Sequence, residues 1–372
     1  MLWRADEHEP LTNQEWDPDL ARAAIAEIVV DAEAAAEEGV WPNHPLDEVP
    51  QDERFCSLYL GGAGMIWGLH RLGSSLDVDA AIAATLDAYR TAPAAEESMH
   101  PPSLLVGETG ILVVAHGLGA SVADEHRLSE LVRANREHQS WELLYGSPGT
   151  MLAARACGLE QEWQESAALL DEHWNPETDM WTHHWEGRLR PHIGAGHGFA
   201  SNVHALRGFV DDAVLRARVA SLLTRTAHHE GDLVNWPPED RPWGEQEQSV
   251  RVQWCHGAPG IVTTLADLMP LELATAAGEL TWRAGPIRKG HGLCHGTAGN
   301  GFAFLRLYDL TGHPRWLDRA RRFAMHATAQ VARDKQRYGR GRYTLWTGDI
   351  GAALFLKACL DVDPAFPIMD VV

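Results

Sequence analysis

Two short phrases of the chain contain residue types that bind transition metals. Cys255-His256 and Cys294-His295 each begin a phrase of the form Cys-His-Gly-x-x-Gly, and an apolar run follows both phrases. Thiolate sulfur and imidazole nitrogen are ligands that suit zinc. Because the two pairs occupy equivalent positions of a repeated motif, we expect them to meet at one shared metal site.

The number of candidate ligands at equivalent positions of the repeated motif indicates the kind of zinc site. The chain contains several Gly-x-x-Gly steps and one Gly-x-x-Ser step. Only Cys255 and Cys294 are cysteines that stand two residues before the first glycine of such a step. His197, His256 and His295 each stand one residue before it. A structural zinc site usually has four protein ligands, but a catalytic site has three and keeps one position open. Two cysteines and one histidine therefore favour an open site. The alternative is that the cysteines are core residues and the histidines are helix caps.

The metal motifs are two copies of a longer repeat, in which a Gly-x-x-Gly step precedes an apolar run. Seven copies occur, at Gly61 to Gly64, Gly107 to Gly110, Gly146 to Gly149, Gly198 to Ser201, Gly257 to Gly260, Gly296 to Gly299 and Gly348 to Gly351. Runs such as 111–115 are too apolar for a surface helix, so each copy predicts a buried inner helix.

The stretches between the copies are amphipathic and predict outer helices. We expect these helices over 17–38, 78–92, 125–138, 161–173, 211–229, 271–282 and 314–334. Seven inner and seven outer helices predict an all-α fold, an α/α toroid that forms one domain over residues 1–372. The glycines should let the N-termini of the inner helices crowd together, and we expect the active site at that end.

Several stretches outside these helices are predicted to be irregular. They are residues 1–16, the Trp- and His-rich loop 174–192, the loop 230–253 and the basic loop Lys335–Tyr343. Loops as long as the second and third are usually functional or disordered, and the aromatic residues favour a function.

Composition excludes several classes of partner. The 372 residues carry a formal net charge of −21, which disfavours binding to nucleic acid and to anionic membranes. No run approaches the ~20 apolar residues of a membrane-spanning helix, and residues 1–7 lack an apolar signal core. Five cysteines are too few and too scattered for a disulfide framework, so we expect a cytoplasmic protein.

The two metal motifs resemble those of a known family. Trp254-Cys-His-Gly-Ala-Pro-Gly260 and Gly292-Leu-Cys-His-Gly-Thr-Ala-Gly-Asn300 are similar to the two signature motifs of the LanC-like family, the relatives of lanthionine cyclases. The phrases 141–146, 196–198 and 345–348 also fit its repeats, so the resemblance covers essentially the whole chain. It is closest to the stand-alone branch that binds glutathione.

The resemblance implies a toroid and a set of site residues. The implied zinc ligands are Cys255, Cys294 and His295. The implied catalytic residues are His197 as acid/base, Arg251 as its support, and Glu142 where bacterial cyclases have Asp. The implied glutathione-binding residues are Lys289, Arg337 and Arg4. The chain departs from the family pattern at Ser201 and at His256, which is Tyr in some cyclases.

Three functions remain open. The first is a zinc enzyme that adds a thiol, that of glutathione, to dehydroalanine or dehydrobutyrine in a peptide or protein. The second is a lanthionine-forming cyclase that uses the cysteine of its own peptide substrate. The third is a module that binds zinc and glutathione without turnover. A toroidal glycosidase is disfavoured because it needs paired carboxylates at the open end, where this chain has Cys and His.

Overall fold

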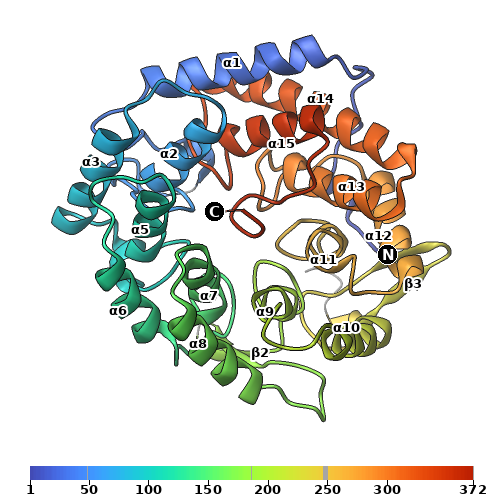
Figure 1. Ribbon diagram of the computed structural model, residues 1–372. Coiled ribbons are helices and arrows are strands. Elements are labelled where there is room, and N and C mark those ends of the chain that lie inside the picture. The colour runs from blue at the N-terminus through green and yellow to red at the C-terminus, as the bar shows by residue number, and fades with distance from the viewer. Residues whose placement is uncertain (48, 186, 246–249, 372) are drawn as a thin grey trace.

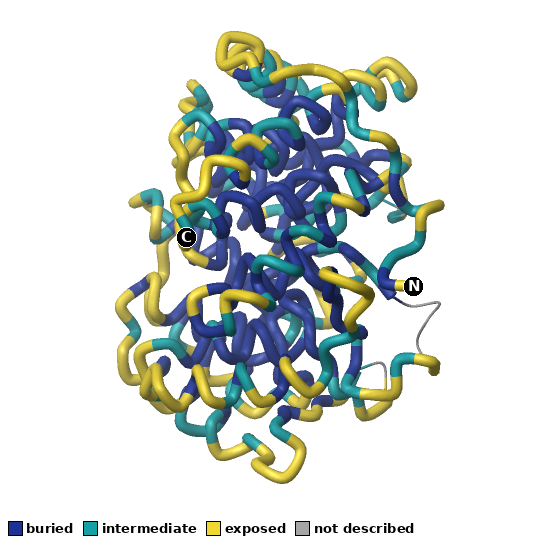
Figure 2. The backbone as a smooth tube through the Cα atoms, turned by 90° about the vertical axis from the view of Figure 1, so that its right-hand side faces the viewer, coloured by how far each residue is buried: buried dark blue, intermediate teal, exposed yellow. Residues whose placement is uncertain are grey.

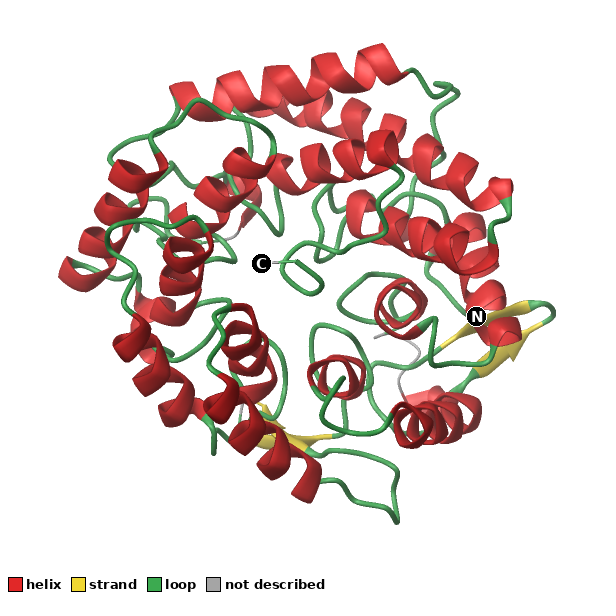
Figure 3. Ribbon diagram, in the orientation of Figure 1, coloured by secondary structure: helices red, strands yellow, loops and turns green. Residues whose placement is uncertain are grey.

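The helices of the chain form two concentric rings around one axis (Figures 1 and 3). The computed structural model describes residues 1–47, 49–185, 187–245 and 250–371. Within these ranges the inner ring has seven helices, which are α2 (Gly62–Arg71), α5 (Glu108–Gly117), α7 (Ser147–Ala156), α9 (Phe199–Ala205), α11 (Ala258–Leu265), α13 (Thr297–Thr311) and α15 (Asp349–Asp361). Each packs against the next, and α15 packs against α2, so the ring is closed. The predicted α/α toroid is confirmed.

The outer ring also has seven helices in the described ranges. They are α1 (Pro18–Ala34), α3 (Val78–Thr91), α6 (Glu125–Asn135), α8 (Glu160–Glu172), α10 (Asp212–Thr226), α12 (Leu271–Ala284) and α14 (Pro314–Tyr338). Four begin with an aspartate whose carboxylate accepts a backbone N–H of the first turn, at Asp17, Asp77, Asp124 and Asp211. These caps satisfy amide groups that the helix itself leaves unpaired.

The repeated glycines have a common steric cause. An added Cβ at Gly64, Gly110 or Gly351 would collide with the carbonyl oxygen of the residue six positions earlier, because the loop folds back over the first turn of its helix. The next contact comes from the neighbouring repeat: Leu58 approaches Gly110, and Leu345 approaches Gly64. The second glycine of each Gly-x-x-Gly step therefore allows both the preceding loop and a side chain of the adjacent repeat to approach the helix. The predicted crowding of the inner-helix N-termini explains only part of the need for these glycines.

Two β-hairpins and shorter helical turns complete the chain, and the hairpins correct the predicted loops. Strand β1 (His183–Trp185) pairs antiparallel with β2 (Arg188–Arg190), and β3 (His228–Glu230) pairs with β4 (Leu233–Asn235). The remaining elements are α4 (Ala95–Met99), η1 (Ala5–Glu7), η2 (Pro45–Asp47) and η3 (Trp243–Glu245). The predicted fifth outer helix ends before β3, so its last residues are strand rather than helix.

Two terminal predictions also need correction. Residues 1–16, predicted to be irregular, are fixed by contacts with distant parts of the chain. Leu2 is fully buried, its carbonyl accepts a hydrogen bond from Asn235 Nδ2 at 2.8 Å, and His8 forms a β-bridge with Ile287. The basic stretch that begins at Lys335 is not all loop, because α14 continues to Tyr338 and includes Arg337. Long-range contacts at the N-terminus and helical propagation of α14 override the polar composition on which both predictions rested.

The core follows the inner ring. Buried backbone fills the middle of the molecule, and exposed residues lie at its periphery (Figure 2). The seven inner helices are buried along almost their whole length, as their apolar runs predicted. Among the described helices, each is too short or too polar to cross a bilayer.

Candidate metal centre and active site

Three side chains from two adjacent repeats converge at one end of the toroid. One ligand atom each of Cys255, Cys294 and His295 lies within 4.8 Å of the other two. Both cysteines are buried and His295 is half-buried. Ligand atoms about 2.0–2.3 Å from one zinc ion lie within this limit of one another, so these three side chains could hold the ion.

Backbone hydrogen bonds place the two ligand loops side by side. The amide of Cys255 donates to the carbonyl of Cys294 at 3.1 Å, and the amide of Cys294 donates to the carbonyl of Trp346 at 2.9 Å. Three consecutive repeats are thereby linked at their helix entrances. Gly257 has φ +106°, where an added Cβ would also meet the carbonyl of Arg251. This left-handed position favours glycine and turns the chain from Cys255 into α11.

The loop before α9 also lies against the first cysteine. Its glycines permit the contact, because a Cβ at Gly196 would stand 2.8 Å from the Cβ of Cys255. The amide of Gly196 donates to the carbonyl of Cys255 at 3.2 Å. His197, the next residue, is therefore carried into the same end of the toroid as the cysteines.

The two thiols influence each other strongly. A hydrogen bond from Cys255 holds the pKa of Cys294 well below its ordinary value, with further support from His295 and Tyr59 against the opposing effect of burial. The pKa of Cys255 is raised well above its ordinary value by the same hydrogen bond and by burial. Two buried sulfurs at this distance cannot both ionise unless a cation offsets their repulsion. This donor set therefore fits a zinc ion.

Sequence reasoning missed Tyr59, which comes from the first repeat. Its hydroxyl forms a hydrogen bond with Cys294, and burial followed by the Cys294 charge raises the pKa of Tyr59 well above its ordinary value. Its ring stacks on Trp346 with centroids 5.7 Å apart. Tyr59 stands two residues before Gly61, the position that Cys255 and Cys294 occupy in their own repeats, and this shared register was the available signal.

The predicted acid/base has a buried carboxylate partner. His197 Nδ1 lies 3.1 Å from Glu142 Oε2. Glu142 is fully buried, and its two oxygens also accept the amides of Leu144 and Tyr145 at 2.8 and 2.7 Å. Two fixed backbone donors orient the carboxylate, so it in turn fixes the imidazole with Nδ1–H as donor. The Nε2 atom of His197 is then the position that can exchange a proton.

Other histidines pack around His197 and are held neutral. The His256 ring stacks on His197 with centroids 5.3 Å apart, and His192 lies 5.7 Å from His256. Burial, followed by the charge of His197, lowers the pKa of His256 to about 3. Burial and neighbouring charges likewise lower the pKa of His192 to about 2 and that of His183 to about 4. Two of these imidazoles stand on or beside the β1–β2 hairpin, in the stretch predicted to be a functional loop.

Two of the predicted arginines, Arg251 and Arg4, lie close to the same side-chain carboxylate, that of Glu7. Arg251 Nη1 lies 3.4 Å from Glu7 Oε1, and Arg4 Nη1 lies 3.5 Å from the same oxygen. Arg4 also binds Asp6 at 2.8 Å. The N-terminal segment therefore reaches the same region as the loop that leads to Cys255, and it carries Arg4 with it.

The remaining predicted cations occupy different surroundings. Lys289 is exposed, and its ammonium charge opposes the rise in the pKa of Cys255 that Cys294 and burial cause. Arg337 is exposed near the end of α14, with its guanidinium over the Tyr338 ring at 5.2 Å. Arg342, which belongs to the predicted basic loop, is instead buried and pairs with Asp47 at 2.7 Å. The sequence does not distinguish the buried arginine of this stretch from the exposed ones.

Comparison with known proteins identifies the family. The family model described as lanthionine synthetase C-like protein matches residues 7–371. The chain belongs to the LanC-like family. This LanC-like chain is 27% identical over 357 residues to glutathione S-transferase LANCL1 of Danio rerio, covering 86% of each protein. It is 35% identical over 128 residues to the LanC-like protein GCL1 of Arabidopsis thaliana, covering 31% of this chain and 29% of that protein.

A solved structure shares the LanC-like fold. Nisin cyclase superposes with a TM-score of 0.57 at 14% sequence identity, covering 93% of this chain and all of that chain, 100%. The two proteins therefore share the α/α toroid. The family comprises cyclases and transferases, so an enzyme with a thioether- or glutathione-related activity is supported.

Proposed function

We propose that this LanC-like protein adds the thiol of glutathione to dehydroalanine or dehydrobutyrine residues of a peptide or protein, forming a thioether. The observation that carries the proposal is the convergence of Cys255, Cys294 and His295 beside the His197–Glu142 pair. This arrangement could hold a thiol-binding metal ion next to a group that can transfer a proton. The similarity to a protein named glutathione S-transferase supports glutathione as the thiol.

The metal ligands in this proposal are Cys255, Cys294 and His295. Two thiolates and one neutral imidazole would offset the charge of a bound zinc ion. The chemistry that zinc would supply there is a lower pKa of a substrate thiol, which would keep the sulfur nucleophilic at neutral pH.

The chain's own groups complete the addition. As the sulfur forms its bond to the β-carbon, the electron pair of the double bond moves to the carbonyl of the acceptor and develops enolate charge. The guanidinium of Arg251 stabilises that oxygen. Nε2 of His197 accepts the proton that the thiol loses and then delivers it to the α-carbon, so the addition is balanced. Glu142 stabilises the imidazolium while it carries this proton.

Cations recognise the two carboxylates of glutathione in this proposal. Lys289 lies on the loop that leads to Cys294, Arg4 and Arg251 both approach Glu7, and Arg337 provides a third cation at the end of α14. A chain with a net charge of −21 would otherwise repel an anionic tripeptide. A local cationic group therefore has an electrostatic purpose at this end of the toroid.

The decisive experiment uses mass spectrometry of a dehydroalanine peptide incubated with the zinc-loaded protein and glutathione. We expect a product heavier by one glutathione, and its formation should require both the protein and the thiol. A peptide that also carries a cysteine tests the cyclase. If it yields an isomer of unchanged mass that resists thiol alkylation, the reaction is intramolecular cyclisation and not glutathione transfer. Zinc and glutathione binding with no product from either peptide would support the non-catalytic module.

We also propose a cytoplasmic location. Cys255 and Cys294 must remain reduced to bind the metal, and glutathione must be available in its thiol form. Both requirements are met in a reducing compartment.

A further inference from the structure

The segment of residues 363–371, here called the crossing segment, enters the ring of inner helices. It follows α15 and turns back toward the centre of the toroid, where Figure 1 shows it as the red loop inside the ring. Phe366 is 1% exposed and Ile368 is fully buried. Five of its nine residues are apolar, but two Asp and two Pro interrupt them, so the segment lacks the helical or strand periodicity of a core element.

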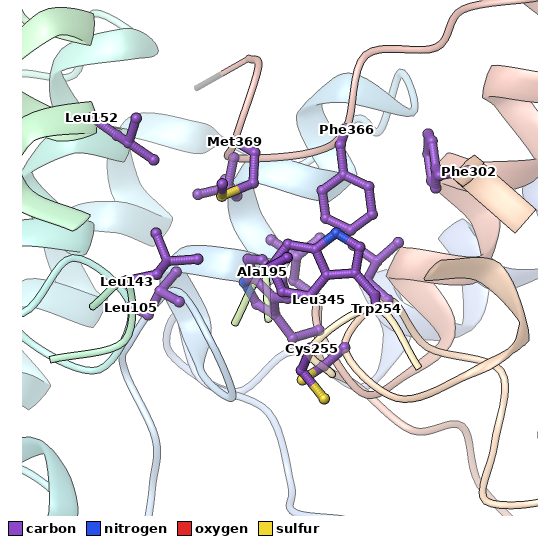
Figure 4. Packing of buried hydrophobic residues seen from close by; sticks show 14 of the residues in the cluster. Leu105, Leu143, Leu152, Ala195, Trp254, Cys255, Phe302, Leu345, Phe366 and Met369 are labelled. Carbon is purple, nitrogen blue, oxygen red and sulfur yellow. The ribbon is translucent and has the colours of Figure 1, made fainter. Parts of the chain in front are cut away.

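The ring of Phe366 packs against two tryptophans that belong to the site-forming loops. It stacks on Trp254 with centroids 4.8 Å apart and planes 5° from parallel, and it lies 6.0 Å from Trp346. The two indoles lie 5.1 Å from each other. Figure 4 shows Phe366 on one side of Trp254 and Cys255 on the other. The three rings form a buried aromatic group directly behind the metal ligands.

Both tryptophans are joined to a ligand through the backbone. Trp254 immediately precedes Cys255 in the chain. The carbonyl of Trp346 accepts the amides of Leu293 and Cys294 at 2.7 and 2.9 Å. A shift of either indole therefore moves the backbone that carries a ligand sulfur. The indole N–H groups of both tryptophans have no hydrogen-bond partner among the described residues, so ring packing is what fixes their positions.

Side chains of two inner helices bind the crossing segment and fix its position. His204 of α9 donates from Nε2 to the carbonyl of Met369 at 2.9 Å, and Arg306 of α13 pairs with Asp370 at 2.6 Å. Asp370 also accepts the amide of Phe366 at 2.8 Å. Ile368 has φ +70°, a conformation that a β-branched residue adopts only where its surroundings impose it. The segment is therefore a clamped element and not a loosely packed end.

We propose that Phe366 is a positioning residue for the metal centre: through Trp254 and Trp346 it fixes the separation of Cys255 and Cys294. This inference rests on the zinc site of the proposed function. Residues that orient metal ligands from outside typically change metal affinity by about 10- to 100-fold when they are altered. Loss of the Phe366 ring leaves a cavity behind both ligand loops and lets them relax apart.

The test measures the zinc dissociation constant by competition with a chromogenic chelator in the full-length protein. We compare wild type, Phe366→Ala, Phe366→Leu and Phe323→Ala. Phe323 is a matched control because it is fully buried and its ring packs against Trp282 and Phe304 instead of the two tryptophans next to the ligands. We expect Phe366→Ala to weaken zinc binding by about 10- to 100-fold, Phe366→Leu to weaken it less, and Phe323→Ala to leave it near the wild-type value while lowering thermal stability.

The outcomes separate this inference from the proposed function. Equal zinc affinities for Phe366→Ala and Phe323→Ala would overturn the positioning role, whatever their thermal stabilities. If Phe366→Ala does not fold, the comparison of Phe366→Leu with Phe323→Ala decides in the same way. If wild type and Cys255→Ala bind the same amount of zinc, the metal site itself is wrong and both proposals fail. Zinc bound by wild type but not by Cys255→Ala, with no effect at Phe366, defeats only the positioning role.

Discussion

Glu142 holds His197 at a fixed orientation, with Nδ1 of the imidazole 3.1 Å from Oε2 of a fully buried carboxylate. Backbone amides of the same turn fix the carboxylate, so the pair is rigid before any substrate binds. Rigid acid/base groups avoid reorganisation during the reaction. The site is therefore organised for proton transfer at Nε2 of His197.

The first prediction concerns this pair. His197→Asn should retain zinc but lose about 10²- to 10⁴-fold in kcat, because general acid/base catalysis contributes that range. Glu142→Gln should lose less, since the amide oxygen can still accept the Nδ1 hydrogen bond. Rates come from mass-spectrometric product formation. His116→Asn is the control, because His116 is a half-buried histidine in the last turn of α5, paired with Glu125. Near-normal turnover of His197→Asn would move the acid/base role to another residue.

The second prediction concerns the metal. Cys255→Ala and Cys294→Ala should each lose most of their zinc, as measured by elemental analysis, while helical circular dichroism persists because the ring of inner helices does not depend on the metal. Cys56→Ala, which removes a buried free thiol outside the motif register, should keep zinc. Full zinc retention in both motif variants would show that these cysteines are core residues only.

The third prediction concerns the choice of thiol. Lys289→Ala and Arg337→Ala should lower kcat/KM for glutathione by about 10- to 100-fold, the value of a charge-assisted hydrogen bond, and leave β-mercaptoethanol nearly unaffected. Arg340→Ala, which loses a contact to Gln51, is the control from the same basic stretch. Equal losses for both thiols would argue against a cationic clamp and favour the peptide cyclase.

The fourth prediction concerns stability against pH. His291 is fully buried, with Nε2 2.7 Å from Asp349 Oδ1 and Nδ1 3.5 Å from Asp334 Oδ2. Burial disfavours its charged form, but the two carboxylates outweigh burial and raise the pKa of His291. Its stabilising contribution is therefore complete below the ordinary histidine pKa of about 6.5 and is lost as pH rises through the raised value in the folded state.

Urea unfolding between pH 6 and 9 tests this expectation. The free energy of unfolding of wild type should fall across this range, and His291→Asn should be destabilised by about 3–5 kcal/mol at pH 6 and by less at pH 9. His326→Asn is the control, because burial lowers the pKa of His326 and the imidazole does not titrate above neutral pH. A constant difference between wild type and His291→Asn at all pH values would contradict the role of the charged imidazole.

Local patterns were enough to predict the architecture. Each inner helix is marked by a glycine step and an apolar run within a few residues, so the copies could be counted without knowing their contacts. The register of Cys255 and Cys294 within that repeat predicted that they meet, since equivalent positions of consecutive repeats lie at the same end of neighbouring helices. The resemblance added His295 as the third ligand.

Tertiary structure decided the features that depend on distant contacts. The hairpins form where local composition indicated only loop, because strand pairing depends on partners and packing. Arg342 is buried and Arg337 is exposed, although both belong to one basic stretch, because only Arg342 reaches Asp47, nearly the whole chain away.

Tyr59 and Phe366 illustrate the same limit at the site itself. Tyr59 reaches Cys294 from the first repeat, and Phe366 reaches Trp254 from beyond the last, because the ring closes and brings its two ends together. The sequence by itself determined the repeat and the register of the metal motifs, which are properties of short segments. Which side chains surround the metal ligands was decided by closure of the toroid, since burial and charge pairing are set by residues far apart in the chain.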